Sequence, residues 1–174
     1  MTQSEPPQGK SNTVLIVVVV VGVALLLVVG VIGILAALGI AGFRSYLSRA
    51  KSVEGSVELT RLSEGLARCG SVELSGGREL PDSASPVPAS LAAVSGKKYM
   101  SSGADWSAPA YTCAAFSMST PQYFQYAWTR TSPSSGTVRA SADLDGDGTA
   151  EIVLERDVTC SSGACTAGIE KKRR

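Results

Sequence analysis

The chain has 174 residues, a formal net charge of +1 at neutral pH and no histidine. The balanced charge gives no bulk field that would draw the protein toward nucleic acid or a membrane surface. The absence of histidine removes the commonest general base and metal ligand, and with it most hydrolase and zinc-site mechanisms. No serine–lysine, cysteine–acid or paired-carboxylate arrangement takes its place, so we do not expect an enzyme.

A long apolar segment dominates the N-terminal third of the chain. Residues 1–12 are polar, and we expect them to form a short disordered leader. From Ser11 through Phe43 no side chain is ionisable. A membrane-spanning helix needs about 20 apolar residues, whereas the apolar part of a signal peptide is only about 7–15 residues long. We therefore predict a transmembrane helix over residues 13–43.

The helical pattern continues without proline over residues 44–69 as an amphipathic extension. Two apolar stripes run along it, the first made of Tyr46, Ala50, Val53 and Val57, the second of Leu59, Leu62, Leu66 and Cys69. At about 100° per residue the two stripes point roughly 170° apart. A single surface helix needs only one stripe, so we predict that the second packs on a globular domain and the first contacts another surface.

The rest of the chain divides into a connector and a β-rich part. Residues 70–108 are rich in serine, glycine, alanine and proline, which predicts a loop-rich connector with a short helix or strand near residues 88–95. Residues 109–174 carry period-two alternation typical of strands. We predict an antiparallel meander of three or four strands, built on Tyr111–Met118, Phe124/Tyr126/Trp128, Val138/Ala140/Ala142 and Ile152–Val158. The three aromatic residues at 124, 126 and 128 are assigned to the core, with a ligand-stacking surface as the alternative.

Four cysteines indicate two disulfides. An even number behind a membrane anchor is typical of an oxidising compartment, and three pairings are possible. We favour Cys160 with Cys165 across a short loop, and Cys69 with Cys113 to tie the end of the helix to the globular part. A metal site made of four thiolates is the rival, but the spacing contains no Cys-x-x-Cys pair.

One acidic loop is the candidate metal site. Residues Asp143–Glu151 place carboxylates at positions 1, 3 and 5 and glycine at position 6, as in the first half of an EF-hand loop. Leu154 stands where the bidentate glutamate of that motif belongs. We predict that Asp143, Asp145, Asp147 and Glu151 hold Ca²⁺, which is the only cofactor we expect; the alternative is a tight Asp-Gly hairpin turn without a metal ion.

The chain ends in a basic cluster, residues 170–174. Four adjacent cations are able to contact nucleic acid or anionic lipid. The cluster contains no aromatic residue, so we expect a solvated, disordered end and predict no nucleic-acid partner.

The end of the apolar segment has a distinctive pattern. It carries an Ile-Gly-Ile-Leu-Ala-Ala run at residues 32–37, the aromatic Phe43 and then the amphipathic half-helix. This pattern resembles the first helix of type IV pilins and type II secretion pseudopilins, over about Gly33–Cys69. The resemblance implies a pilin-like α+β fold, in which a long N-terminal helix packs on a small antiparallel β-meander. Some members of this family hold calcium in a loop near the end of the sheet, which adds to the interpretation of the acidic loop.

The resemblance also implies a function and a location. The chain would be a structural or assembly subunit of a type IV pilus or type II secretion-like system, in contact with other pilin-like subunits through the N-terminal helix. It would be a single-pass inner-membrane protein with a periplasmic or extracellular C-terminal domain. Counting flanking charges points the other way, because Lys10 precedes the apolar segment while Arg44, Arg49 and Lys51 follow it.

Departures from the family pattern support a second hypothesis. Ala24 stands where the family has glutamate, and Ala41 where it has a kinking proline. Gly9 is followed by polar residues, so the prepilin peptidase signature is absent and we expect the N-terminus to stay at or near Met1. The alternative is therefore a membrane-anchored extracytoplasmic binding module that has a pilin-like fold but does not polymerise.

Overall fold

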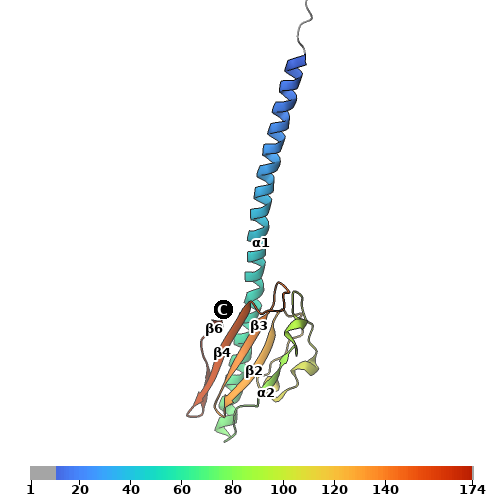
Figure 1. Ribbon diagram of the computed structural model, residues 1–174. Helices are drawn as coiled ribbons and strands as arrows, with labels where there is room; N and C mark the ends of the chain where they lie inside the picture. Colours follow the sequence, from blue (N-terminus) through green and yellow to red (C-terminus); the bar gives the residue numbers. More distant parts are fainter. Residues whose placement is uncertain (1–10, 174) are drawn as a thin grey trace, which may run out of the picture. The chain divides into compact units, whose positions relative to one another are not determined.

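The structure is a computed structural model that describes residues 11–173. The chain forms two compact units, Met1–Tyr46 and Leu47–Arg174. Helix α1 (Ser11–Ser75) contributes to both (Figure 1). Because α1 begins at Ser11, residues 11 and 12 belong to the helix rather than to the predicted leader; the rest of that leader, residues 1–10, lies outside the described part of the chain.

The first unit contains the segment that can cross a membrane. Val14–Leu38 is long and apolar enough for a single span, and each side chain in it is exposed. A soluble core helix of similar composition would be largely buried. Exposure along its full length is what a helix surrounded by lipid requires, so the structure is consistent with the predicted single-pass membrane protein.

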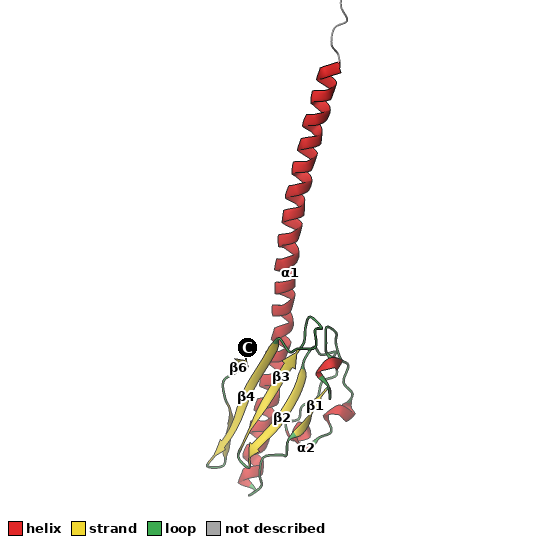
Figure 2. Ribbon diagram, in the orientation of Figure 1, coloured by secondary structure: helices red, strands yellow, loops and turns green. Residues whose placement is uncertain are grey.

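The second unit is built on an antiparallel sheet. Its six strands, counted within the described residues, are β1 (Ala84–Val87), β2 (Gln125–Ser132), β3 (Ser135–Ala142), β4 (Ile152–Ser161), β5 (Ala164–Ala167) and β6 (Lys171–Arg173). They lie in the order β1-β2-β3-β4-β5, and β6 pairs with the first half of β4. Figure 2 shows β1 to β4 side by side in this order. The prediction of three or four strands was therefore too low.

A helix packed on this sheet makes the second unit an α+β domain. Leu59, Leu62 and Leu66 on α1 are fully buried. They belong to one core with Phe124, which directly precedes β2, and with alternating residues of the sheet, namely Tyr126, Trp128, Val138, Ala140 and Ala142. The assignment of the three aromatic residues to the core is confirmed, and none of them is available to a ligand.

At Gly55, helix α1 lies directly against the ring of Phe124, the residue before β2. A Cβ atom at this position would lie 2.5 Å from the Phe124 ring, well inside van der Waals contact. The sequence shows only a weak helix former at residue 55. The structure shows that a side chain there would push α1 away from β2.

Helix α1 ends at Ser75, beyond the predicted end at Cys69. Its last turn closes with the N–H of Arg78 donating to the Glu73 carbonyl and the N–H of Gly77 donating to the Leu74 carbonyl. Gly77 has φ of 72°. This pair of bonds is the Schellman arrangement, which satisfies carbonyls that the helix leaves without partners. The helix therefore stops at the Gly76–Gly77 pair and not at the disulfide.

The segment between α1 and β2 confirms one part of the prediction and departs from it in others. The 3₁₀ helix η1 (Leu91–Ala93) lies in the region near residues 88–95 where a short helix or strand was predicted. Strand β1, which pairs with β2, and the 3₁₀ helix η2 (Gly103–Trp106) were not predicted. The predicted strand Tyr111–Met118 is wrong. Pro109 begins a short helix, α2 (Pro109–Cys113), and Tyr111 is buried with its ring 5.1 Å from that of Trp106. Proline is favoured in the first turn of a helix, where its missing N–H costs nothing.

The C-terminal end is also more ordered than predicted. Residues 171–173 form β6, antiparallel to β4. Lys171 pairs with Asp157, and Arg173 pairs with Glu155. The basic residues find carboxylates spaced two apart on β4, so charge complementarity holds the end of the chain against the sheet.

Candidate metal centre

The acidic loop joins β3 to β4 at one end of the sheet. Strand β3 ends at Ala142 and β4 begins at Ile152, so the register of the two strands fixes both ends of the loop. All four predicted carboxylates come together here. Asp143, Asp145, Asp147 and Glu151 each place a carboxylate oxygen within 4.8 Å of the others.

Asp143 organises the loop from the inside. It is fully buried, and its two carboxylate oxygens accept hydrogen bonds from the N–H groups of Gly146 (2.7 Å) and Gly148 (2.8 Å). Both glycines have positive φ, 86° and 92°, a backbone conformation that residues with a Cβ rarely adopt. The glycines of the motif therefore let the chain turn tightly around one carboxylate.

The other three carboxylates are exposed and bond to the loop backbone. Glu151 accepts from the N–H groups of Leu144 (2.7 Å) and Asp145 (3.1 Å), which draws the end of the loop back onto its start. Asp145 accepts from Asp147 N–H and Asp147 from Thr149 N–H, both two residues along the chain. These are Asx-type turns, and they direct successive carboxylates to the same side as Asp143.

Electrostatics separate the four acids. A hydrogen bond from the Ser95 hydroxyl, followed by those from the loop N–H groups, lowers the pKa of Asp143. A hydrogen bond with Glu151 raises the pKa of Asp145. Burial alone would raise the pKa of Glu151, but bonds from the Leu144 N–H and from Asp145 outweigh it and lower that pKa. A cation bound among the four carboxylates would favour the ionised form of each of them.

The residue set fits a calcium ion in type and spacing. Ca²⁺ takes six to eight oxygen ligands, and Asp and Glu carboxylates in a glycine-containing loop are its usual source. Leu154, at the position of the EF-hand's last ligand, lies in β4 and is buried. Glu151 comes earlier, in the loop itself, and supplies the fourth carboxylate. The geometry supports the predicted ligand set, and calcium binding itself stays a prediction.

One contact to this loop could not be inferred from the sequence. The N–H of Gly96 donates to the Asp143 carbonyl over 2.9 Å, and Ser95 hydrogen-bonds the Asp143 side chain. The segment after η1 therefore covers the buried side of the acidic loop. No local pattern marks Ser95 as a partner of an aspartate so distant in the sequence.

Both disulfides have the favoured pairing. Cys69 at the end of α1 is bonded to Cys113 of α2, and Cys160 of β4 to Cys165 of β5. The second pair is a direct cross-strand pair of the β4–β5 hairpin. Ser162 and Gly163 both have positive φ, as a two-residue hairpin turn requires. Since no free cysteine remains, a thiolate metal site is excluded.

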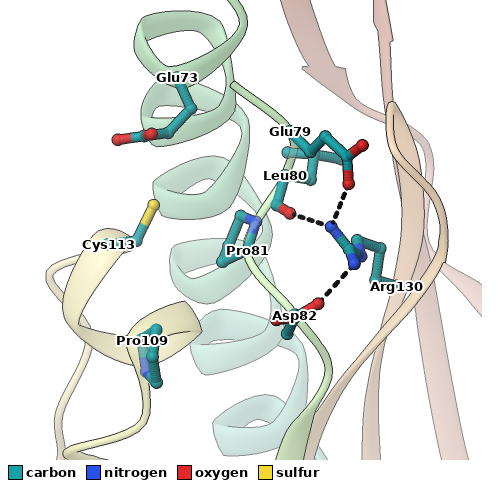
Figure 3. Close-up of a pocket in the computed structure, with 8 residues that line it drawn as sticks. All are labelled: Glu73, Glu79, Leu80, Pro81, Asp82, Pro109, Cys113 and Arg130. Atoms are coloured by element: carbon teal, nitrogen blue, oxygen red, sulfur yellow. Dashed lines mark hydrogen bonds and ion pairs between the residues drawn. The ribbon is translucent and has the colours of Figure 1, made fainter. Parts of the chain in front are cut away.

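A cavity of about 360 Å³ lies beside the first disulfide (Figure 3). Arg130 of β2 points toward the carboxylates of Glu79 and Asp82, with which it forms ion pairs, and also donates to the Leu80 carbonyl. These contacts attach residues 79–82 to β2. The Arg130 guanidinium therefore has a structural role, because its contacts fix residues 79–82 to the sheet.

A second, larger hollow covers the face of the sheet that points away from α1. Its volume is about 540 Å³, and the lining is polar, from Gln125, Thr129 and Thr131 of β2 to Arg139 of β3 and Glu155 of β4. Glu155 is buried between Arg139 and Arg173. This face has no aromatic residue among its described lining residues.

Comparison with protein-family models, with curated proteins and with solved structures found no match for this chain.

Proposed function

We propose that the chain is a membrane-anchored, pilin-like subunit of a type IV pilus or type II secretion-like assembly. The observation that carries this proposal is the exposed apolar stripe on α1 in the second unit. Val53 is 59% and Val57 56% exposed, and Ala50 is also exposed. A helix that packs on its own sheet gains nothing from apolar residues on its free face, whereas a subunit interface does.

The position of the stripe strengthens the proposal. In the second unit it begins at Ala50, a short way along the chain from Leu38, where the membrane-spanning segment ends. A neighbouring copy anchored in the same membrane is therefore held where its own α1 can meet this stripe, which raises the effective concentration of the contact.

The predicted side of the membrane also has support. Two disulfides in a domain of this size are typical of an oxidising compartment. We therefore propose that the second unit lies on the periplasmic or extracellular side of the inner membrane. No catalytic role is proposed, because the buried acids of the domain serve hydrogen bonds and ion pairs.

A non-polymerising binding module is the second candidate. The polar hollow of about 540 Å³ on the outer sheet face favours it, as do Ala24 and Ala41 in place of the family's glutamate and proline. In this hypothesis the sheet face, rather than α1, would meet the partner.

Site-directed cross-linking separates the two hypotheses. All four native cysteines are in disulfides, so a single engineered cysteine is the only free thiol in the chain. We expect Val53→Cys to give covalent dimers in membranes treated with a thiol cross-linker, because each subunit offers one thiol. The matched control is Arg68→Cys, at an exposed and charged position of the same helix, which should stay monomeric. Monomers alone from both Val53→Cys and Val57→Cys would contradict a polymerising subunit and favour the binding module.

A further inference from the structure

Lysines converge on one tyrosine in the second unit. The Nζ of Lys51 lies 4.5 Å from the centre of the Tyr123 ring, and the Nζ of Lys98 lies 4.9 Å from it. Lys97 precedes Lys98 in the same exposed segment. Lys51 belongs to α1, so residues distant in sequence meet at Tyr123. We call Lys51, Lys97, Lys98 and Tyr123 the lysine–tyrosine surface.

These lysines differ from most cations of the domain. The cations that each form an ion pair include Arg61, Arg78, Arg130, Arg139, Lys171 and Arg173. Among the described residues, no carboxylate lies within ion-pair distance of Lys51, Lys97 or Lys98. The nearby Glu54 uses its carboxylate to accept the Tyr123 N–H over 2.7 Å. The ammonium groups of this surface thus keep their charge available to an external anion.

The surface lies where the chain enters the domain. The second unit starts at Leu47, and Lys51 follows soon after the membrane-spanning segment ends at Leu38. Even fully extended, the stretch from Leu38 to Lys51 spans no more than about 45 Å. No acidic residue occurs between Glu5 and Glu54, while Arg44 and Arg49 add two cations to the linking sequence. The anion that is always within reach of this surface is the headgroup layer of the membrane.

We propose that the lysine–tyrosine surface docks on anionic lipid headgroups of the membrane that the same chain spans. The inference rests on the membrane anchoring included in the proposed function, but not on polymerisation. Ammonium groups attract lipid phosphates, and a lysine near an anionic membrane surface strengthens association about fivefold. Tyrosine is enriched at the same depth, because its ring contacts the acyl boundary while its hydroxyl stays hydrated.

The acidic loop lies next to the lysine–tyrosine surface, so lipid binding has to be measured with the loop free of calcium. Gly96, which directly precedes Lys97, hydrogen-bonds Asp143 of that loop. The exposed carboxylates of the loop oppose the approach of anionic lipid, so a measurement in chelator is the stringent one. The full chain would be placed in nanodiscs of phosphatidylcholine, or of phosphatidylcholine with about one third phosphatidylglycerol. Acetylation rates of individual lysines are then read by mass spectrometry.

We expect Lys51, Lys97 and Lys98 to react about fivefold more slowly in the anionic discs. In about 1 M NaCl, where the screening length falls to about 3 Å, the difference should disappear. The double variant Lys97→Gln/Lys98→Gln should restore the reactivity of Lys51 in the anionic discs. The matched control Arg68→Gln, which removes an exposed cation elsewhere on α1, should leave Lys51 protected.

The outcomes separate the inference from its premise. Equal rates in both kinds of disc, or Lys51 protection that survives the double glutamine variant, would overturn the docking surface. Protection by duplex DNA in phosphatidylcholine discs, without protection by phosphatidylglycerol, would assign the surface to nucleic acid and overturn it as well. A chain that does not enter discs at all contradicts the membrane span, and with it both proposals.

Discussion

Truncating Leu62 to alanine tests the two-faced character of α1. Leu62 is fully buried in the core between α1 and the sheet. A buried leucine replaced by alanine loses the transfer free energy of the removed carbons and leaves a cavity, which together cost about 2–5 kcal/mol. Val53 lies on the opposite, exposed face. Its replacement by alanine should change the free energy of unfolding by no more than about 0.5 kcal/mol.

The expected shift in melting temperature follows from the size of the second unit. For a domain of this length, 1 kcal/mol corresponds to about 4 °C. Leu62→Ala should therefore lower the melting temperature by about 10 °C, and Val53→Ala by about 2 °C or less. Both tryptophans of the chain, Trp106 and Trp128, are buried in this unit. The tryptophan band of the near-ultraviolet circular dichroism spectrum, recorded on the full chain in detergent, thus follows the unfolding of the second unit.

One result would refute the reasoning. If Val53→Ala lowered the melting temperature as much as Leu62→Ala, the first stripe would be packed within the monomer. The exposed apolar face on which the proposed function rests would then not exist. A small effect of both variants would show instead that α1 contributes little to the core.

Three further predictions concern the loop, the tyrosines and the disulfides. Millimolar calcium should raise the melting temperature of the second unit by several degrees relative to chelator, since a ligand at a hundredfold excess over Kd stabilises the folded state by about 2.7 kcal/mol. Asp145→Ala should abolish this rise. Identical melting curves of the unchanged protein in calcium and in chelator would show that the loop is a turn that binds no calcium. Burial raises the pKa values of Tyr111 and Tyr126 above the ordinary value of 10. At least two of the five tyrosines should therefore stay un-ionised at about pH 11 in an ultraviolet titration of the folded protein. Because the phenol pKa is higher in the folded than in the unfolded state, the stability that the un-ionised phenols contribute is fully present below about pH 10 and is lost as the pH rises above it. Ionisation of all five tyrosines before the protein unfolds would contradict the raised pKa values. Replacing Cys69 and Cys113 by alanine should lower the free energy of unfolding by about 4 kcal/mol, and replacing Cys160 and Cys165 by about 2 kcal/mol. The first disulfide costs more to lose because it closes a longer loop, with a sequence separation of 44 residues against 5. Denaturant unfolding measures both losses, and equal losses would contradict the loop-length argument.

Local periodicity carried the predictions that hold. An apolar run without charge predicted a helix long and apolar enough to span a membrane, because only its length and composition matter for that. The stripe of Leu59, Leu62 and Leu66 predicted the buried side of α1. The alternation of Phe124, Tyr126 and Trp128 predicted that these three residues face the core, the last two from β2. The spacing of Asp143, Asp145 and Asp147 predicted their convergence, because a tight loop brings alternate side chains together.

The wrong predictions concern short segments whose local sequence is compatible with more than one secondary structure. Tyr111–Met118 alternates well enough for a strand, yet Pro109 starts a helix and Tyr111 packs on Trp106. The segment of residues 171–173 is too short and too highly charged for its sequence to predict a strand. They form β6 because Asp157 and Glu155 of β4 offer partners at matching spacing.

By itself, the sequence of this protein determined which segment is long and apolar enough to span a membrane, which residues continue the long helix and which build the central strands. Length and composition mark the first, and periodicity records which face of a helix or strand avoids water. Only the tertiary structure decided which distant groups meet. It brought Ser95 and Gly96 to the buried side of Asp143, and it placed Lys51 and Lys98, from distant parts of the sequence, around Tyr123. Such meetings depend on strand register and on the path of loops, which arise from packing over the whole domain and leave no periodic trace in the chain.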